Sequence, residues 1–251
     1  MKQKEKIAIS IDPALLARID AMVDGERVKS RSHAIEMLLR AALAESMPAT
    51  AVILAGGKGV RPSDRKRAVL SRILAWLGGF GVQEVIVVGN SPLVESAGDA
   101  VPSIRFLFEE SPRGTAGALA LARSVVKNTF LLLYADTLCD FDLMSMLAQH
   151  ARERPLVTMA LTEVKNASRY GAVELEGVRV KGFVEKPPPG KEPSRLVNAG
   201  VYVLEPRIFD FLPKSGSLER DVLPELAKAG LVHGFVFTGK WLDAHRGDVN
   251  A

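Results

Sequence analysis

The pattern of apolar and polar positions divides the chain into a short amphipathic part and a longer part in which strands and helices alternate. Residues 6–11 alternate strictly between polar or small residues and isoleucine, which predicts a strand with one apolar face. Asp12 followed by Pro13 predicts the start of a helix, and Ser30 predicts the start of a second helix that ends before Pro48. The first part of the chain therefore has the order strand, helix, helix.

A unit of this size is too small to be stable by itself. A single strand leaves its backbone donors and acceptors unpaired, and two short amphipathic helices bury little apolar surface. We therefore expect the first part of the chain to form a homodimer or a higher homo-oligomer.

From residue 49 onward, short apolar runs alternate with segments that have helical periodicity. This order is typical of an α/β fold with a Rossmann-like, mostly parallel sheet covered by helices on both faces. From Tyr170 the pattern changes to hairpin-like strands, followed by apolar runs at residues 199–204 and 232–237. We expect two domains, residues 1–47 and residues 48–251. The earlier expected strands are Ala51–Leu54, Glu84–Val88, Ile104–Phe108, Thr129–Tyr134 and Leu156–Leu161, and the helices are Ala68–Phe80, Gly114–Lys127 and Leu143–Arg152.

Composition narrows the class of protein. The chain has 251 residues, of which 47% are hydrophobic and 25% are charged, as in ordinary globular proteins. The formal net charge of +4 is compatible with phosphate-bearing ligands but does not by itself indicate nucleic-acid binding. Cys139 is the only cysteine, which excludes an internal disulfide and favours a reducing compartment. Because no run approaches the roughly 20 apolar residues of a membrane span, we expect a cytoplasmic protein without a membrane partner.

The run Ala51–Leu54 leads directly into a glycine-rich turn containing Gly56, Gly57 and Gly59. A strand that enters such a turn and then a helix can bring backbone N–H groups close to a phosphate, because glycine has no Cβ. Basic residues in and after the turn, Arg61 among them, fit the same ligand. A tight turn with a solvated basic flank is the alternative.

Residues 4–46 resemble the ribbon-helix-helix family of DNA-binding proteins. Lys6–Pro13 resembles the strand and helix start of that family, and Val28–Ile35 resembles the beginning of its second helix. The resemblance implies an intertwined dimer whose paired strands enter the major groove of DNA. The residues that it assigns to DNA binding are Lys6, Ala8 and Ser10 on the ribbon, with Ser30 and Arg31 on a phosphate.

The charge of this segment leaves a second interpretation open. Up to residue 47 it has eight Lys/Arg and seven Asp/Glu, whereas DNA-binding domains usually have a clear basic excess. Ala8 also has no side-chain group that could form a hydrogen bond with a base. The alternative is a dimerisation module without DNA binding.

Residues 49–247 resemble the sugar-1-phosphate nucleotidyltransferases, which make NDP-sugars. The matching motifs occur in the order of that family: Leu54–Gly59, Arg113–Leu119, Tyr134–Asp136, Tyr170–Leu175, Gly182–Pro187, Val197–Leu204, Leu218–Pro224 and Trp241–Asp243. The resemblance implies that a sugar-1-phosphate attacks the α-phosphate of an NTP, and that pyrophosphate leaves. Such a reaction joins two anions, so the protein has to neutralise charge and align the reactants.

The resemblance also implies roles for individual residues. Oxygen ligands suit Mg²⁺, a hard cation, which usually binds one or two carboxylates together with waters and phosphates. The implied metal ligands are Asp136 and Asp243, which with Arg61 and Lys66 form the catalytic set. The implied nucleotide-binding residues are Gly56, Gly57, Gly59, Gly114, Thr115 and Gly117. The implied sugar-phosphate-binding residues are Glu185, Lys186, Asn198 and Gly200.

The signature loop departs from the pattern of the family. Val60 replaces a threonine, Pro62 follows Arg61 directly, and Lys66 comes five residues after Arg61, where the family has about a dozen. Two functions therefore stay open. One is an active sugar-1-phosphate nucleotidyltransferase assembled through its N-terminal segment. The other is a DNA-binding transcriptional regulator whose degenerate transferase domain senses a nucleotide or sugar nucleotide. The sequence does not specify the NTP, the sugar or the operator.

Overall fold

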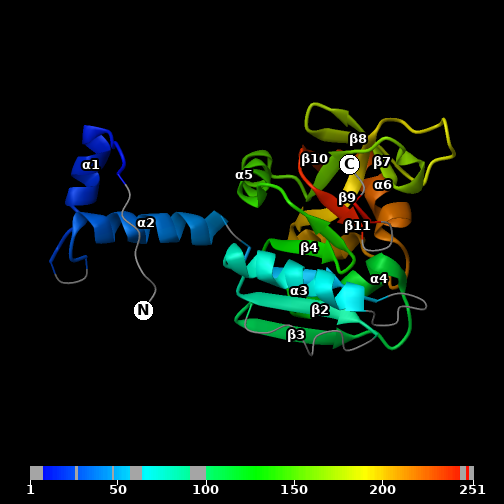
Figure 1. Cartoon of the computed structure of the whole chain (residues 1–251), viewed down its shortest axis with the longest axis horizontal. Coiled ribbons are helices and arrows are strands. Elements are labelled where there is room, and N and C mark those ends of the chain that lie inside the picture. The colour runs from blue at the N-terminus through cyan, green and yellow to red at the C-terminus, as the bar shows by residue number, and fades with distance from the viewer. Residues whose placement is uncertain are drawn as a thin grey trace. The chain divides into compact units, whose positions relative to one another are not determined.

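The structure analysed is a computed structural model, which describes residues 8–25, 28–46, 48–56, 64–90, 100–243 and 247–248 (Figure 1). The side chains of residues 40–46, 64–66, 243, 247 and 248 lie outside this description. Contacts divide the chain into two compact units, Met1–Glu45 and Ser46–Ala251. None of the helices in the described ranges is long and apolar enough to cross a membrane.

Helix α1 covers Pro13–Asp20 and begins where the sequence predicts. The carboxylate of Asp12 accepts hydrogen bonds from the N–H groups of Ala14, at 2.9 Å, and Leu15, at 3.2 Å. These bonds satisfy backbone donors that the start of a helix leaves unpaired. The predicted N-cap at Asp12 is thus confirmed.

Helix α2 covers Arg31–Ser46, and its predicted cap is also present. The hydroxyl oxygen of Ser30 accepts a hydrogen bond from the N–H of His33 at 3.2 Å. Among the described side chains of this unit, the buried core consists of Ile19, Val28 and Ala34.

The strand expected at residues 6–11 is absent from the part of it that the structure describes. Residues 8–12 have no regular secondary structure, and residues 6 and 7 lie outside the described residues. A strand exists only when its N–H and C=O groups pair with a neighbouring strand. The ribbon expected from the sequence needs that neighbour from a second copy of the chain, which a single chain does not supply.

The larger unit is built on a nine-stranded sheet with the order β3-β2-β1-β4-β9-β6-β10-β8-β7. Within it β1 is parallel to β2 and β4, β2 is parallel to β3, and β6 is parallel to β10. The strands are β1 Thr50–Leu54, β2 Glu84–Gly89, β3 Ser103–Phe108, β4 Phe130–Tyr134, β6 Val157–Glu163, β7 Gly171–Glu176, β8 Arg179–Glu185, β9 Leu196–Leu204 and β10 Val232–Val236.

Two strands run against the direction expected for a mostly parallel sheet. β9 is antiparallel to both β4 and β6, and β8 is antiparallel to β7 and β10. For β8 the cause is the tight β7–β8 hairpin, because strands joined by a short turn have to be antiparallel. The sheet is therefore mixed, and β9 lies in its middle.

A second sheet contains the short strands β5 (Thr137–Cys139), β11 (Trp241–Asp243) and β12 (Gly247–Asp248), in the order β12-β11-β5. The helices of the larger unit are α3 Asp64–Gly79, α4 Gly114–Ala120, α5 Leu143–Glu153 and α6 Leu223–Lys228. Short helical turns occur at Leu121–Ser124, Ala167–Arg169, Pro206–Phe211 and Leu218–Val222.

Buried side chains form one cluster on each face of the large sheet. Ala51 and Ile53 of β1 belong to the cluster that contains the apolar residues of α3 and α5, whereas Val52 and Leu54 belong to the cluster of α4 and α6. Successive residues of a strand point to opposite faces, so a strand buried on both faces is apolar throughout. This explains why the expected strands read as continuous apolar runs.

The carboxyl ends of β1 and β4 lie side by side, since Leu54 is in register with Tyr134. The glycine-rich turn after β1 and Asp136 after β4 consequently begin at the same edge of the sheet. Open α/β sheets bind their ligands beyond this edge.

Candidate active site

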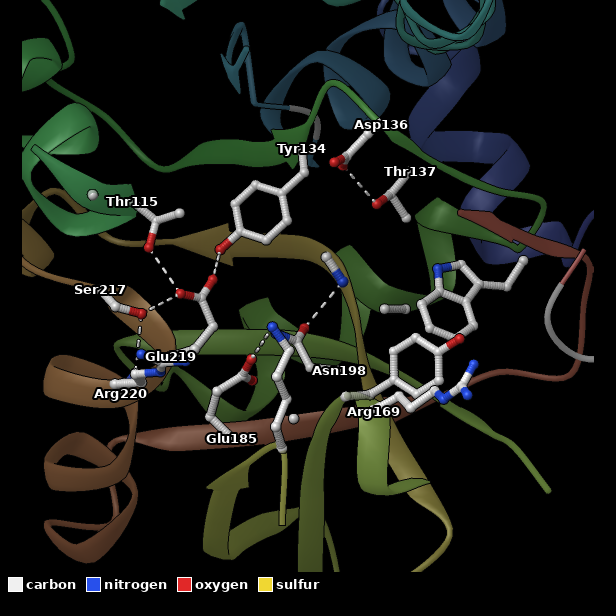
Figure 2. A pocket seen from close by; sticks show the side chains of 17 residues that line it. Thr115, Tyr134, Asp136, Thr137, Arg169, Glu185, Asn198, Ser217, Glu219 and Arg220 are labelled. Atoms are coloured by element: carbon white, nitrogen blue, oxygen red, sulfur yellow. Dashed lines mark hydrogen bonds and ion pairs between the residues drawn. The ribbon is translucent and has the colours of Figure 1, made fainter. Parts of the chain in front are cut away.

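A pocket of about 540 Å³ lies where β4 and β8 end and β7 and β9 begin. Figure 2 shows the side chains that line it. It gathers side chains from widely separated segments of the chain. The expected site residues that line it are Gly114, Thr115, Asp136, Glu185, Lys186, Asn198 and Gly200. The other lining residues are Tyr134, Thr137, Arg169, Tyr170, Gly171, Ala199, Ser217, Glu219, Arg220 and Trp241.

Asp136 is half-buried in the loop between β4 and β5, and its Oδ1 accepts a hydrogen bond from the hydroxyl of Thr137 at 3.2 Å. β11 is antiparallel to β5, and the backbone of Asp243 is in register with Thr137. Asp136 thus directly precedes β5, and Asp243 lies on the neighbouring strand β11, although the side chain of Asp243 lies outside the described residues.

The carboxylate of Asp136 is the kind of oxygen ligand that suits a magnesium ion. Among the described side chains there is no group of three or more His, Cys, Asp or Glu that could hold a metal. Mg²⁺ does not need one, because it is usually bound by one or two carboxylates while waters and substrate phosphates complete its shell. Asp136 with Asp243 would supply this pair.

Glu185 and Lys186 are consecutive and both line the pocket. Consecutive residues of a regular strand point to opposite faces. Here β8 ends at Glu185, and Lys186 adopts a left-handed backbone conformation with φ of 51°, which turns its side chain back to the pocket. The backbone N–H of Lys186 donates to the carbonyl of Tyr170 at 2.9 Å. The side-chain Nζ of Lys186 lies 3.5 Å from Oε1 of Glu185.

Burial raises the pKa of the Glu185 carboxyl above its usual value of 4.5, and the negative charge of Glu219 raises it further. The positive charges of Lys186 and Arg220 act in the opposite direction on this pKa. Space for Glu185 comes from Gly171. A Cβ at that position would lie 2.4 Å from Cζ of Phe183 and 3.1 Å from Oε2 of Glu185.

Asn198 and Gly200 belong to β9 and hold each other in place. Oδ1 of Asn198 accepts the N–H of Gly200 at 3.0 Å, and Nδ2 of Asn198 donates to the hydroxyl of Tyr202 at 2.5 Å. Gly200 has a φ of +78°, and a Cβ there would lie 3.1 Å from the ring of Tyr134. Both facts favour glycine at this position.

The start of α4 is packed against the loop at residues 213–217. Gly114 has a φ of +76°, and a Cβ there would lie 2.3 Å from the carbonyl oxygen of Gly216. A Cβ at Gly117 would lie 2.8 Å from the carbonyl oxygen of Lys214. Gly117, expected to bind the nucleotide, is buried against this loop and is not among the residues that line the pocket. Its lack of a side chain permits the close packing.

Glu219 is a site residue that sequence reasoning missed. Its carboxylate accepts hydrogen bonds from the hydroxyls of Tyr134, of Thr115 at 2.8 Å and of Ser217 at 2.7 Å. Burial and the neighbouring charge of Glu219 raise the pKa of Tyr134 well above its ordinary value. The sequence motif that contains Glu219 matches the family, but Thr115 and Tyr134 are far away along the chain. No local pattern could therefore reveal the cluster.

The glycine-rich turn is described only up to Gly56. A Cβ at Gly56 would lie 2.6 Å from Oε2 of Glu109, a buried residue whose Oε1 accepts the N–H of Arg113 at 2.8 Å. The remaining expected residues of this part, Gly57, Gly59 and Arg61, lie outside the described residues, as does the side chain of Lys66. The backbone of Lys66 belongs to the first turn of α3.

The expected DNA-binding residues are only partly described. Lys6 lies outside the described residues, and Ala8 and Ser10 are exposed in a segment without strand structure. The guanidinium of Arg31 donates to both carboxylate oxygens of Asp20, at 2.6 and 2.8 Å. This pairing lowers the pKa of Asp20, first through the hydrogen bonds and then through the charge of Arg31.

Known proteins resemble this chain in sequence. A catalytic subunit beta of mannose-1-phosphate guanylyltransferase from Dictyostelium discoideum is 32% identical over 221 residues, which cover 77% of this chain and 60% of the relative. The chain spans less than two thirds of the length of the curated relatives that it matches.

Solved structures share the fold as well. HddC from Yersinia pseudotuberculosis has a TM-score of 0.65 and 27% identity, with 77% of this chain and 92% of that chain covered. The structure of HddC complexed with GMP-PN has a TM-score of 0.63 and 26% identity, with 78% and 93% covered.

The sequence profile named nucleotidyl transferase matches residues 78–249, which is more than half of the chain. The match begins after the shortened signature loop and includes every described residue of the pocket. Together with the relatives and the fold, it confirms the nucleotidyltransferase domain expected from the motifs. The chain therefore belongs to the nucleotidyl transferase family.

Proposed function

We propose that the domain at residues 48–251 transfers a nucleotidyl group from an NTP to a sugar-1-phosphate. In this reaction an oxygen of the sugar phosphate attacks the α-phosphorus, the bond from that phosphorus to the bridging oxygen breaks, and pyrophosphate leaves. The observation that carries the proposal is the pocket, where Asp136 lies together with the Glu185–Lys186 pair and Asn198. Its position beyond the carboxyl end of β4 suits a nucleotide.

Both reactants are anions, so the first task of the site is to reduce their repulsion. Asp136 and Asp243 would hold Mg²⁺, which neutralises phosphate charge when it is bound. Lys186 presents an ammonium group to the same pocket and would bind the phosphate of the sugar. Arg61 and Lys66 would contact the triphosphate.

The sugar itself would lie against β8 and β9. Asn198 has one amide N–H left after its bond to Tyr202, and this N–H can donate to a sugar hydroxyl. Glu185 can accept from hydroxyls in its ionised form. Groups held in this way align the attacking oxygen with the α-phosphorus, and alignment supplies much of the rate acceleration in reactions of this type.

We propose a guanosine nucleotide and a sugar of the mannose type as substrates. The names of the guanylyltransferase relatives and the HddC complex with GMP-PN support this choice.

The test is pyrophosphate release in the presence of Mg²⁺ from a panel of NTPs and hexose-1-phosphates. Wild type should turn over on the order of 1 s⁻¹ or faster with its preferred pair. Asp136→Asn should abolish turnover. Asp140→Asn is the matched control, because Asp140 is an exposed residue four positions away and outside the pocket. The absence of turnover with every pair would refute the proposal, and so would equal activity of the two variants.

For residues 1–47 we propose a ribbon-helix-helix dimer that binds DNA. The support is that this unit exposes more large apolar side chains than it buries among its described residues. Among the side chains that the structure describes here, three form the buried core, whereas several large apolar ones are exposed. A second copy would cover them and would supply the missing strand neighbour. The exposed side chains are Ile9, Leu15, Met22, Met37, Leu38 and Leu39, which are 36–54% accessible.

Light scattering tests the assembly. The full chain should have at least twice the monomer mass of 27.1 kDa, and Leu39→Asp should reduce it by placing a charge in the proposed interface. A monomeric wild type at micromolar concentration would refute the dimer. DNA binding is tested by selection from random duplexes at physiological salt, with Lys6→Ala as the variant. If no sequence is enriched, the dimerisation module without DNA binding is the correct interpretation.

The second candidate function is a regulator whose transferase domain binds a nucleotide or sugar nucleotide without turnover. The shortened signature loop favours it, because lost triphosphate contacts reduce transition-state stabilisation more than they affect the fold. In that case GTP or GDP-mannose should raise the melting temperature without pyrophosphate release, and should change the affinity for the selected DNA.

A further inference from the structure

The carboxylate of Glu219 receives side-chain hydrogen bonds from three separate parts of the pocket (Figure 2). The hydroxyl of Tyr134, at the end of β4, donates to Oε1. Oε2 accepts from Thr115 on α4 and from Ser217 on the preceding loop, at 2.8 and 2.7 Å. An ionised carboxylate can only accept hydrogen bonds, so all three hydroxyl protons point to Glu219.

The same donor-to-acceptor direction continues from Tyr134 to two side chains of β9. Because the proton of Tyr134 is held by Glu219, the oxygen of Tyr134 can accept from the hydroxyl of Tyr202, which lies 3.4 Å away. The oxygen of Tyr202 then accepts from Nδ2 of Asn198 at 2.5 Å. The chain of donors thus runs from Asn198 through two tyrosines to one carboxylate, and Tyr202 is 1% exposed, so water cannot replace its partners.

The orientation of the Asn198 amide is determined at both ends. Its Oδ1 is held by the N–H of Gly200 at 3.0 Å, and its Nδ2 is held by Tyr202. Asn198 therefore keeps one amide N–H that can donate to a ligand in the pocket. Thr115, at the other end of the network, lies next to Gly114 on the expected nucleotide side.

We infer that Glu219 is a positioning residue that orients Thr115 on the nucleotide side and, through Tyr134 and Tyr202, Asn198 on the sugar side. Glu219 thereby links the two halves of the pocket. This inference rests on the proposed function, since it assumes that the halves bind a nucleotide and a sugar. Glu219 acts through these neighbours and needs no contact with the reacting atoms.

The isosteric variant Glu219→Gln tests the role of the charge. A glutamine amide has one acceptor oxygen and one NH₂ group, so at least one of the hydroxyls that now point to Glu219 has to turn away or lose its partner. A hydrogen bond to a charged group contributes about 1.5–3 kcal/mol, which corresponds to a change in affinity of about tenfold or more. We expect weaker binding of both halves of the ligand.

The measurement is titration calorimetry with GDP and with GDP-mannose on the full chain. The dissociation constant of GDP divided by that of GDP-mannose reports the contribution of the sugar, and this ratio falls when that contribution is lost. In Glu219→Gln, GDP should bind about tenfold more weakly, and the ratio should also fall. In Tyr202→Phe, which cuts the chain of donors beyond Tyr134, GDP binding should stay unchanged and only the ratio should fall, about tenfold.

The matched control is Glu205→Gln. Glu205 is another partly buried carboxylate that accepts from two side chains, Thr129 at 2.8 Å and His150 at 3.0 Å, but it does not line the pocket. Its substitution should lower the melting temperature without changing either dissociation constant. A merely structural role of Glu219 would give the same result as this control. The double variant Glu219→Gln/Tyr202→Phe should show no further loss of the sugar contribution, because both changes interrupt one chain.

The outcomes distinguish a failure of the inference about Glu219 from a failure of the proposed function. If wild type binds neither ligand and releases no pyrophosphate, the proposed function fails. If wild type binds both and Glu219→Gln behaves like Glu205→Gln, the inference is wrong while the function stands. Should Glu219→Gln not fold, Tyr134→Phe replaces it. Tyr134→Phe cuts the same chain one step earlier, so a sugar contribution equal to that of wild type would overturn the inference.

Discussion

The packing of the loop at residues 213–217 on α4 makes a sharp prediction for Gly114. A Cβ at this position would lie 2.3 Å from the carbonyl oxygen of Gly216 and 2.8 Å from its carbonyl carbon, closer than any real Cβ approaches. These atoms belong to the backbone and cannot move aside as a flexible side chain could. In Gly114→Ala the loop therefore has to leave α4.

The cost has two parts. Alanine at a φ of +76° costs about 1–2 kcal/mol relative to glycine. Displacing the loop breaks two backbone hydrogen bonds, from Ala116 N–H to Gly216 O at 3.0 Å and from Gly216 N–H to Arg113 O at 2.8 Å. At about 1 kcal/mol each, these add about 2 kcal/mol. We expect the free energy of unfolding to fall by about 3–4 kcal/mol.

Gly190→Ala is the control that separates the backbone cost of alanine at positive φ from the cost of displacing the loop. Gly190 has a φ of +79°, close to that of Gly114, but a Cβ there would have no atom within 4 Å. This control should lose only the backbone part, about 1–2 kcal/mol. Urea denaturation followed by tryptophan fluorescence measures both variants, because the two tryptophans, Trp76 and Trp241, lie in the larger unit.

The difference between the variants isolates the packing of the loop. If Gly114→Ala and Gly190→Ala lose the same stability, the loop does not need to approach α4 closely, and the reasoning is refuted. Because the loop leads into Ser217 and Glu219, we also expect Gly114→Ala to raise the KM for the nucleotide, whereas Gly190→Ala should not change it.

Three further predictions concern single side chains. Burial raises the pKa of the Cys139 thiol, so iodoacetamide should not label the native protein at pH 8 but should label it after unfolding. Labelling of the native protein at the rate of a free thiol would contradict this. The folded-state pKa of Glu185 lies above 4.5, so its contribution to stability is fully present below that pH and is lost as the pH rises through the raised value. Glu185→Gln, which stays neutral, should therefore gain stability relative to wild type between pH 4 and pH 7 in urea denaturation, and the opposite trend would disprove the assignment. Gly171→Ala would press on Phe183 and Glu185 and should raise the KM for the sugar-1-phosphate several-fold more than the KM for the NTP; equal changes in steady-state kinetics would argue against a sugar role for Glu185.

Much of the fold could be predicted from local patterns. The apolar runs at residues 51–54 and 129–134 became β1 and β4, and the caps at Asp12 and Ser30 formed as expected. These features depend on neighbours within a few residues, so the sequence itself contains the relevant chemistry. Asp136, Glu185, Lys186 and Asn198 could be named because each belongs to a motif that resembles the sugar-1-phosphate nucleotidyltransferases.

The strand at residues 6–11 shows the limit of this reasoning. Residues 6–11 alternate as a strand with one apolar face would, yet residues 8–12 form no strand in the single chain. A helix satisfies its own backbone, but a strand depends on a neighbour. A sequence pattern can indicate that a segment is suited to a strand without showing where the neighbouring strand comes from.

Glu219 and Gly117 show what only the tertiary structure decides. Thr115 and Glu219 are 104 residues apart along the chain, and Tyr134 and Glu219 are 85 apart. Their hydrogen bonds exist because the fold brings the carboxyl end of β4 and the beginning of α4 to the segment that contains Glu219. Gly117, which the motif assigns to the nucleotide, is also the place where the loop at residues 213–217 packs on a helix. The sequence by itself thus determined which segments form helices and strands and which residue types carry the chemistry, since these depend on local spacing. The tertiary structure decided which of those residues meet, because hydrogen bonds and close packing act over a few ångströms in space, wherever the partners stand in the chain.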